Sequence, residues 1–429
     1  MNIDAALVRY VGASAPRGTV KREIALPDGR FISAIIGPRR AGKTTFMLQV
    51  MDGMSLPASN KILVNGEDVN LEGVTADELS RIEEAAFRIY RPDRTKEICL
   101  FIDEVQNLPS WPRWVRTLHD SGMYKIVVTG STSELSTLKL PSTLRGRALN
   151  TLVLPFSFRE FLASKGTDYS SYMPPSKTGE IASLAEEFVE HGGYPAVVLS
   201  EGRELKLRVL QELYESVIQR DMIEREGVRR SALLRAFMNA VLGSACRPLS
   251  VRSITRWLGS EGLKMGKQTA INYLDSAESV FLILRAYPHS MKPKERRVNP
   301  KLYVVDSGLL TLVGADSAKK LENQVFIELI RRGKRVGYWK SRSTAKEVDF
   351  VVESDRGKSE LIQVAYSLRD PATSIREVDA IVEASDAIGA TSLVIVTRDE
   401  EKVINERGKT ISVVPAWRWF LWPPQRTPD

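Results

Sequence analysis

Strand-like and helix-like stretches alternate in the first third of the chain. Four short stretches are rich in apolar and β-branched residues, which is typical of buried strands: 31–36, 61–65, 98–103 and 124–130. Between the second and the third, residues 76–90 repeat apolar side chains at helical spacing. The alternation predicts a parallel α/β sheet that ends by residue 157, with a ligand at the carboxyl ends of its strands.

The rest of the chain changes pattern three times. Between residues 246 and 300 the spacing predicts helices at 251–258 and 267–279 and a strand at 280–285, which is the order of a winged helix. Helical spacing precedes this segment, and alternating strands and helices follow it. We therefore expect four domains: an α/β core at 1–157, a helical region at 158–245, a winged helix at 246–300 and a second α/β domain at 301–429.

A phosphate-binding loop follows the first predicted strand. Its spacing fits G-x-x-x-x-G-K-[ST], and the helix after it would point its positive end at an anion. The glycines let backbone N–H groups turn toward a phosphate, Lys43 would reach the β- and γ-phosphates, and Thr44 would ligate Mg²⁺. The predicted nucleotide contacts are Gly37, Pro38, Arg39, Arg40, Ala41, Gly42, Lys43, Thr44 and Thr45.

The strand at 98–103 ends in two carboxylates, Asp103 and Glu104. In a P-loop protein that hydrolyses ATP, the first acid holds Mg²⁺ through water and the second polarises the attacking water. Asp103 is therefore the predicted metal ligand and Glu104 the predicted general base. Thr129 and Ser131 end the next strand and are candidates for sensing the γ-phosphate, although strand-end capping explains them equally well.

Two arginines, Arg145 and Arg147, flank Gly146 shortly after this strand. Either could stabilise transition-state charge as an arginine finger, within the chain or across an interface between copies. A solvated turn is the alternative interpretation. A finger that acts between copies implies a homo-oligomer.

Polar and basic residues of the predicted winged helix suit a nucleic acid. Its second helix offers Lys267, Gln268 and Asn272 to a groove. The segment from Arg285 to Lys301 carries six Lys or Arg against one glutamate, which suits a phosphate backbone. Packing or protein contact is the alternative use of the segment. The DNA-contact candidates in it are Lys292, Lys294, Arg296 and Arg297.

Three residues of the last segment have the order and spacing of a metal-dependent nuclease site: Glu322, Asp349 and Gln363. In such a site a helix Glu, a strand Asp and an [Glu/Gln]-x-Lys strand bind Mg²⁺ and position water. The lysine position falls on Ala365, so we predict a degenerate site without cleavage activity. The carboxylates could still bind a metal, or only hydrogen-bond one another within a retained scaffold.

Composition narrows the remaining possibilities. The chain has 429 residues, a formal charge of +8 and a pI of about 9.3, which mildly favours an anionic partner. Its two cysteines, Cys99 and Cys246, lie in apolar contexts and predict core positions in a reducing compartment. The three histidines are too scattered for a zinc site, and no apolar run is long enough to cross a membrane. We expect a cytoplasmic protein without a membrane partner.

Motifs along nearly the whole chain resemble one known group, the archaeal-type P-loop ATPases of the STAND/AAA-like branch with a C-terminal PD-(D/E)XK nuclease-like domain. These motifs lie at 36–45, 101–111, 127–131, 144–147, 154–161, 192–195, 220–225, 303–308, 321–323, 347–350 and 362–364. The resemblance implies that Pro195, in a Gly-Gly-x-Pro turn, lies against the adenine of ATP. It also implies that the restriction-endonuclease-like fold of 301–429 is degenerate.

The motifs predict a Mg²⁺-dependent ATPase that couples its nucleotide state to binding of duplex or branched DNA. The coupling would act through the winged helix and the nuclease-like domain. Two alternatives are open at this point. One is a STAND-type signalling or defence switch that binds protein partners, and the other is an active metal-dependent DNA nuclease.

Overall fold

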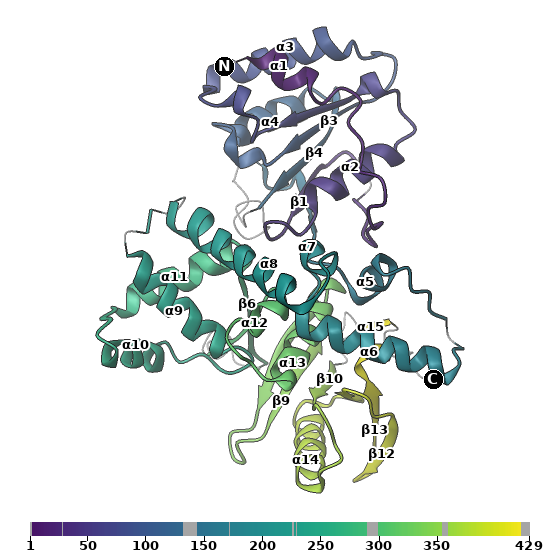
Figure 1. Ribbon diagram of the computed structural model, residues 1–429, viewed down its shortest axis with the longest axis vertical. Helices are drawn as coiled ribbons and strands as arrows, with labels where there is room; N and C mark the ends of the chain where they lie inside the picture. The colour runs from purple at the N-terminus through teal and green to yellow at the C-terminus, as the bar shows by residue number, and fades with distance from the viewer. Residues whose placement is uncertain are drawn as a thin grey trace. The chain divides into compact units, whose positions relative to one another are not determined.

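The computed structural model of the protein describes eight ranges: 2–27, 29–131, 144–170, 172–224, 227–228, 230–289, 299–353 and 359–421. The chain divides into two compact units, one of Met1–Leu154 with Ser279–Phe281 and the other of Pro155–Glu278 with Leu282–Asp429 (Figure 1). Each unit is built around its own sheet. No helix in the described ranges combines the length and the apolar character that spanning a bilayer requires.

The sheet of the first unit is parallel throughout, as the sequence pattern predicts. Its strands are β1 (Ile32–Ile36), β2 (Lys61–Asn65), β3 (Ile98–Asp103), β4 (Tyr124–Gly130) and β5 (Ala148–Leu152). They lie in the order β2-β3-β4-β1-β5. β1 lies between β4 and β5, so the loop after it lies at the carboxyl ends of the strands and away from either side of the sheet. This is where α/β proteins bind their ligands.

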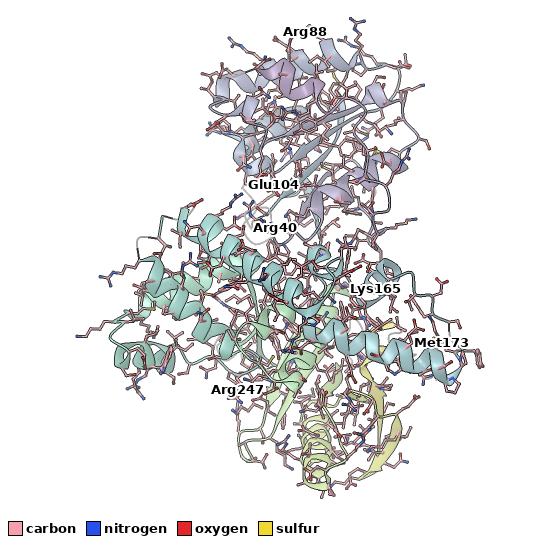
Figure 2. The ribbon with its side chains drawn as sticks, viewed as in Figure 1. Arg40, Arg88, Glu104, Lys165, Met173 and Arg247 are labelled. Atoms are coloured by element: carbon pink, nitrogen blue, oxygen red, sulfur yellow. The ribbon has the colours of Figure 1, made fainter. Side chains whose placement is uncertain are left out.

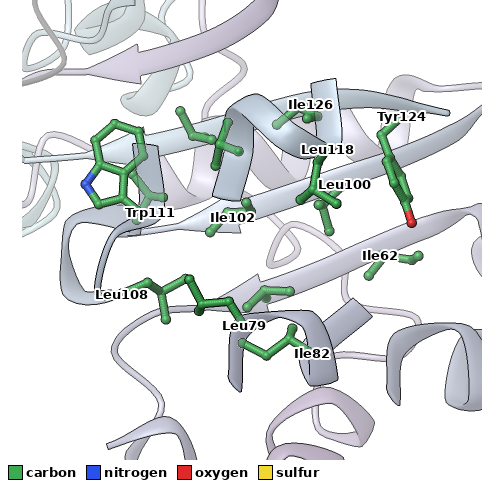
Figure 3. Packing of buried hydrophobic residues seen from close by; sticks show 14 of the residues in the cluster. Ile62, Leu79, Ile82, Leu100, Ile102, Leu108, Trp111, Leu118, Tyr124 and Ile126 are labelled. Atoms are coloured by element: carbon green, nitrogen blue, oxygen red, sulfur yellow. The ribbon is translucent and has the colours of Figure 1, made fainter. Parts of the chain in front are cut away.

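Four helices cover the two faces of this sheet: α1 (Ile3–Val8), α2 (Lys43–Gly53), α3 (Leu79–Tyr90) and α4 (Trp111–Asp120). Leu100 belongs to the apolar cluster under α1, α3 and α4 (Figure 3), and the next residue, Phe101, belongs to the cluster under α2. Neighbouring strand residues point to opposite faces, so every residue of β3 is buried. This double burial is why the sequence of β3 is an unbroken apolar run up to Asp103.

The second unit contains most of the helices. They are α5 (Phe158–Ser164), α6 (Pro175–His191), α7 (Pro195–Val198), α8 (Arg203–Ser216), a π-helix (Val217–Glu224), α9 (Ser231–Gly243), α10 (Val251–Ser260), α11 (Lys267–Ser279), α12 (Gly308–Thr311), α13 (Ser317–Arg331), α14 (Pro371–Ile388) and α15 (Ala416–Leu421). The predicted helices at 251–258 and 267–279 correspond to α10 and α11.

An eight-stranded mixed sheet runs through the second unit in the order β12-β13-β11-β10-β9-β8-β6-β7. Its strands are β6 (Ile283–Pro288), β7 (Lys301–Val304), β8 (Arg335–Lys340), β9 (Glu347–Glu353), β10 (Ser359–Val364), β11 (Ser392–Thr397), β12 (Lys402–Glu406) and β13 (Lys409–Pro415). Apolar residues of α14, including Ile381, pack on Leu361 and Ile395 of this sheet.

The structure has two compact units, and the division into four domains stays a prediction. The predicted end of the first domain at residue 157 lies close to Leu154, where the first unit ends. The predicted boundary between residues 300 and 301, in contrast, falls inside the second unit. There β6 pairs antiparallel with β7, with Ile283 opposite Val304, and parallel with β8. A strand needs neighbours to satisfy its backbone, and β6 finds them in the predicted C-terminal domain.

Candidate nucleotide-binding site

The loop between β1 and α2 has a backbone that requires glycine at residues 37 and 42. Gly37 has a φ of 148°, and a Cβ atom there would lie 2.1 Å from the carbonyl oxygen of Val153. Gly42 caps the amino end of α2 in the left-handed region, with a φ of 94°. Residues 37–42 therefore bend tightly in front of the positive end of an 11-residue helix, which is the arrangement that binds a phosphate.

Lys43 is held across this loop with 4% of its surface exposed. Its Nζ donates a hydrogen bond to the carbonyl oxygen of Pro38 at 3.1 Å and lies 3.7 Å from Glu104 Oε1. Arg40 of the loop and Glu104 lie at the same edge of the first unit (Figure 2). The ammonium thus faces the general base predicted from the sequence, at the edge where phosphates would bind.

One hydroxyl fixes both predicted acids. Thr129 donates a hydrogen bond to Asp103 Oδ1 and accepts one from the backbone N–H of Glu104 at 2.9 Å. The hydroxyl of Thr44 donates to the other oxygen of Asp103 at 2.8 Å. Burial, with the charge of Glu104 beside it, raises the pKa of Asp103 although these hydrogen bonds and Lys43 act in the opposite direction.

These residues fit Mg²⁺. A hydroxyl and a carboxylate oxygen already lie together at Thr44 and Asp103, and hard oxygen donors are what Mg²⁺ prefers. In a P-loop site the remaining ligands are phosphate oxygens and waters, so two protein side chains are sufficient. A cation there would also favour the ionised form of Asp103, against the effect of burial.

Gln106 is a site residue that the sequence analysis missed. Its Nε2 donates a hydrogen bond to Glu104 Oε2 and lies 3.4 Å from Ser131 Oγ. Its Oε1 is buried, and among the described residues it has no hydrogen-bond partner. Glu104 itself has a φ of 46°, a conformation unusual for a residue with a side chain. The sequence signal would have been the polar residue two positions after the acid pair.

Arg22 is a second residue that the sequence analysis missed. Its guanidinium is buried and donates to the carbonyl oxygens of Ala41 at 2.8 Å and Leu154 at 2.6 Å. It thereby ties the phosphate loop to the strand end beyond β5. No local pattern marks this role, because the two carbonyls belong to segments far from Arg22 in the sequence.

The structure places Arg147 at the end of β1 that lies away from the phosphate loop of its own chain, and the arginine-finger role of Arg145 or Arg147 stays a prediction. Ala148 pairs with Ile32 at the start of β1, whereas the loop follows Ile36 at its end. A strand of this length spans roughly 16 Å, which is more than an arginine side chain can bridge. Arg147 instead binds Asp120 Oδ1 at 3.1 Å. A role across an interface between copies stays a prediction.

Pro195 begins α7 in the second unit, and the turn before it is fixed by a buried aspartate. Asp306 Oδ2 accepts the backbone N–H of Gly193 at 2.7 Å, and Oδ1 accepts the N–H of Gly308 at 2.9 Å. A Cβ atom on Gly192 would lie 1.6 Å from Asp306 Oδ1, so the turn requires a glycine there. The adenine contact of Pro195 stays a prediction.

The three predicted nuclease-site residues come together in the second unit. Glu322 lies on α13, Asp349 on β9 and Gln363 on β10. Gln363 Oε1 accepts the backbone N–H of Asp349 at 3.1 Å, and the ammonium of Lys301 lies within 3.3 Å of both carboxylates. The prediction of Lys301 as a basic residue of the wing is wrong, because it is 1% exposed and binds acids.

The DNA-contact candidates fall into two groups. Lys267, Gln268 and Asn272 are exposed on α11, where Gln268 Nε2 donates to Asn272 Oδ1 at 2.9 Å. The other candidates lie outside the described residues: Lys292, Lys294, Arg296 and Arg297. Arg285 is less available than its sequence suggests, since it pairs with Asp275 at 2.7 Å and Glu278 at 3.4 Å.

Comparisons with known proteins found one match to the first unit and others to most of the chain. A sequence profile described as an AAA domain matches residues 29–162. Two profiles described as domains of unknown function, DUF8612 and DUF4143, match residues 183–319 and 318–419. The uncharacterised protein MJ1544 of Methanocaldococcus jannaschii is 31% identical over 403 residues, which are 91% of this chain and 88% of that protein. The chain belongs to the family of MJ1544.

Two further proteins are similar to this chain. An uncharacterised protein of Haemophilus influenzae is 29% identical over 372 residues, 85% of this chain and 88% of that protein. Among solved structures, the Walker-type ATPase paby2304 of Pyrococcus abyssi is similar, at 14% identity and a TM-score of 0.43 over 70% of this chain and 99% of that one. The prediction of a P-loop ATPase domain is confirmed by the AAA match, which covers the loop and both acids.

Proposed function

We propose that the first unit binds ATP with Mg²⁺ and hydrolyses it. The observation that carries this proposal is the double use of the Thr129 hydroxyl, which holds the side chain of Asp103 and the backbone of Glu104. Hydrolysis by a P-loop protein needs one acid at the metal and a second at the attacking water. The shared hydroxyl orients the Asp103 carboxylate and fixes the backbone from which the Glu104 side chain extends.

The chain's own groups have separate tasks in this reaction. The backbone N–H groups of the loop 37–42, apart from Pro38, which has none, and the ammonium of Lys43 donate to phosphate oxygens. Mg²⁺, when bound, neutralises phosphate charge and orients the terminal phosphate. The incoming phosphates compete with Glu104 for Lys43, because phosphate and carboxylate are both anions. Glu104 then keeps its contact with Gln106 and accepts the proton of the attacking water.

Phosphate release from ATP with and without Mg²⁺ tests the proposal. We expect Glu104→Gln to keep ATP binding and to lower hydrolysis by about 100-fold or more, since a general base contributes that much. Lys43→Ala should lose binding as well. Glu72→Gln, an exposed acid of the same unit, is the matched control and should behave as the native protein. Undiminished hydrolysis by Glu104→Gln would exclude the proposed base.

The second unit couples this ATPase to DNA in our proposal. Five basic side chains between α9 and the start of α11 are exposed: Arg247, Arg252, Arg256, Lys264 and Lys267. Trp257, on the same helix as two of them, is 50% exposed and offers a ring for stacking. Gln268 and Asn272 add the polar groups that can read base edges. This charge and its polar neighbours support an anionic polymer as the partner.

Anisotropy of labelled duplex and branched DNA tests the coupling. In the Glu104→Gln protein, we expect an ATP analogue to change the DNA affinity and added salt to weaken it steeply. The double variant Arg252→Glu/Arg256→Glu should lose binding, whereas Lys402→Glu, which reverses one charge on β12, should retain it. Equal affinity with and without the analogue would reject the coupling, and absence of binding at low salt would favour a switch that binds protein partners.

A further inference from the structure

Lys301 lies at the centre of a buried carboxylate cluster in the second unit. Its Nζ lies 2.7 Å from Glu347 Oε1, 2.9 Å from Asp349 Oδ1 and 3.3 Å from Glu322 Oε1. An ammonium has three N–H donors, and here each has a carboxylate within reach. The lysine is 1% exposed, so these acids replace the water that it would otherwise bind.

The acids of this cluster come from different elements and are themselves held in place. Glu347 and Asp349 alternate along β9 and therefore share one face of the sheet, while Glu322 comes from α13. The hydroxyl of Tyr303 donates to Glu322 Oε1 at 2.9 Å. The second oxygen of Asp349 accepts the backbone N–H of Val364 at 3.0 Å. The cluster thus joins β7, β9, β10 and α13 around one positive charge.

The three surrounding acids favour a cation at this position. Burial alone would lower the pKa of Lys301, but Asp349, Glu322 and Glu347 outweigh it and raise the pKa well above its ordinary value. Burial, with the charge of Asp349 beside it, raises the pKa of Glu322 to about 8. Without the ammonium, three acids would face one another in a site with little water, which is strongly unfavourable.

A divalent metal would need the space that the ammonium fills. Mg²⁺ and Ca²⁺ bind six or more oxygens at about 2.0–2.6 Å. In the part of the chain that the structure describes, no group of three or more His, Cys, Asp or Glu side chains could hold a metal ion. The acids here contact Lys301 instead. This lysine lies on β7, whereas the lysine of a nuclease site would lie at the position of Ala365, directly after β10.

We propose that Lys301 is the resident cation of the Glu322–Glu347–Asp349 cluster, where its ammonium takes the place of a divalent metal and closes the site to one. This inference is independent of the proposed ATPase activity. A tethered cation is always present at its site, so it offsets part of the negative charge of the cluster without a metal from solution. It follows that the intact protein binds no metal here and does not cleave DNA through these acids.

Mn²⁺ binding followed by electron paramagnetic resonance tests this in the full chain without nucleotide. Asp103→Asn serves as the background, because it removes the metal ligand of the first unit. We expect this background protein to bind no Mn²⁺ that depends on Asp349. Adding Lys301→Met, which ends one atom short of the ammonium position and removes its charge, should create a site for one Mn²⁺, at least about tenfold tighter than any site of the background protein. Adding Asp349→Asn to that variant should abolish the new site.

Either of two results of the Mn²⁺ measurement would overturn the proposal. One is an equivalent of Mn²⁺ bound by the background protein with Lys301 intact and lost on Asp349→Asn. The other is a folded Lys301→Met variant that gains no Mn²⁺. If Lys301→Met does not fold, the measurement on the intact lysine still decides. DNA cleavage by the native protein with Mn²⁺, abolished by Asp349→Ala, would also overturn it.

Discussion

Thr129 donates a hydrogen bond to the side chain of Asp103 and accepts one from the backbone N–H of Glu104. Among the described residues, we find no other side chain bound to both of these predicted acids in this way. Thr129→Val keeps the shape and removes both hydrogen bonds. We expect stability to fall by about 1–3 kcal/mol, because Asp103 and the N–H of Glu104 lose a buried partner. Hydrolysis should fall more than ATP binding, which stopped-flow binding and steady-state turnover would separate.

Thr129→Ser is the matched control for this prediction, since it retains the hydroxyl and should retain most of the turnover. A Thr129→Val protein with native turnover would show that the two acids are positioned by other groups.

Gln106 should act as a positioning residue for Glu104. Gln106→Leu removes the amide that binds Glu104 Oε2, so we expect kcat to fall about tenfold while the Kd for ATP is unchanged. Asn107→Leu alters the exposed neighbour and should leave both values as they are. Equal losses in kcat and in ATP affinity would indicate a general structural defect of the site.

Gly37 should tolerate no side chain. A methyl group there would lie 2.1 Å from the carbonyl oxygen of Val153, at a φ of 148° that alanine avoids. We expect Gly37→Ala to abolish nucleotide binding and to lower the unfolding temperature of the first unit. Gly53→Ala is the control, because its Cβ would meet no atom within 4 Å and its helix position favours alanine. Both are measured by thermal unfolding with and without ATP.

Asp306 should make the second unit more stable at acidic pH. Burial raises the pKa of Asp306 from its ordinary value of 3.8 to about 6, although the N–H groups of Gly193 and Gly308 act in the opposite direction. The carboxyl group of Asp306 therefore keeps its proton in the folded protein at a pH where it has lost that proton in the unfolded chain. Stability from this group is full below pH 3.8 and falls by about 3 kcal/mol as pH rises to 6.

Asp306→Asn cannot ionise, so the difference in unfolding free energy between it and the native protein should change across this window and be constant above it. Chemical denaturation at several pH values between 4 and 7 measures the difference. Parallel pH profiles of the two proteins would contradict the expected titration.

The phosphate site could be predicted because its parts are local. A phosphate is bound by consecutive backbone N–H groups, so the loop from Gly37 to Gly42 carries its own signature in the sequence. Asp103 and Glu104 end a strand that is buried on both faces, and such a strand reads as a continuous apolar run. For Thr129, a role at this site and ordinary strand-end capping were equally supported, because its contact with the two acids depends on the pairing of β3 with β4.

Other residues could not be assigned from the sequence because their roles depend on distant partners. β5 was missed since it is an edge strand with mixed burial and an irregular apolar pattern. Without it, nothing in the sequence showed that Arg147 lies at the start of β1 and not at its end. Lys301 looked like part of a basic surface because the residues before it are basic, yet its three acidic partners follow it by 21 to 48 positions.

The contact between Asp306 and Gly193 also limits which sequence changes this protein can accept during evolution. The turn and the aspartate are 113 positions apart, yet the aspartate fits only a turn whose glycines leave room for it. A recombination event that joined the front half of one relative to the back half of another would separate two surfaces shaped for each other. We therefore expect the segments on either side of β6 to be inherited as a pair, with each constraining the variation of the other.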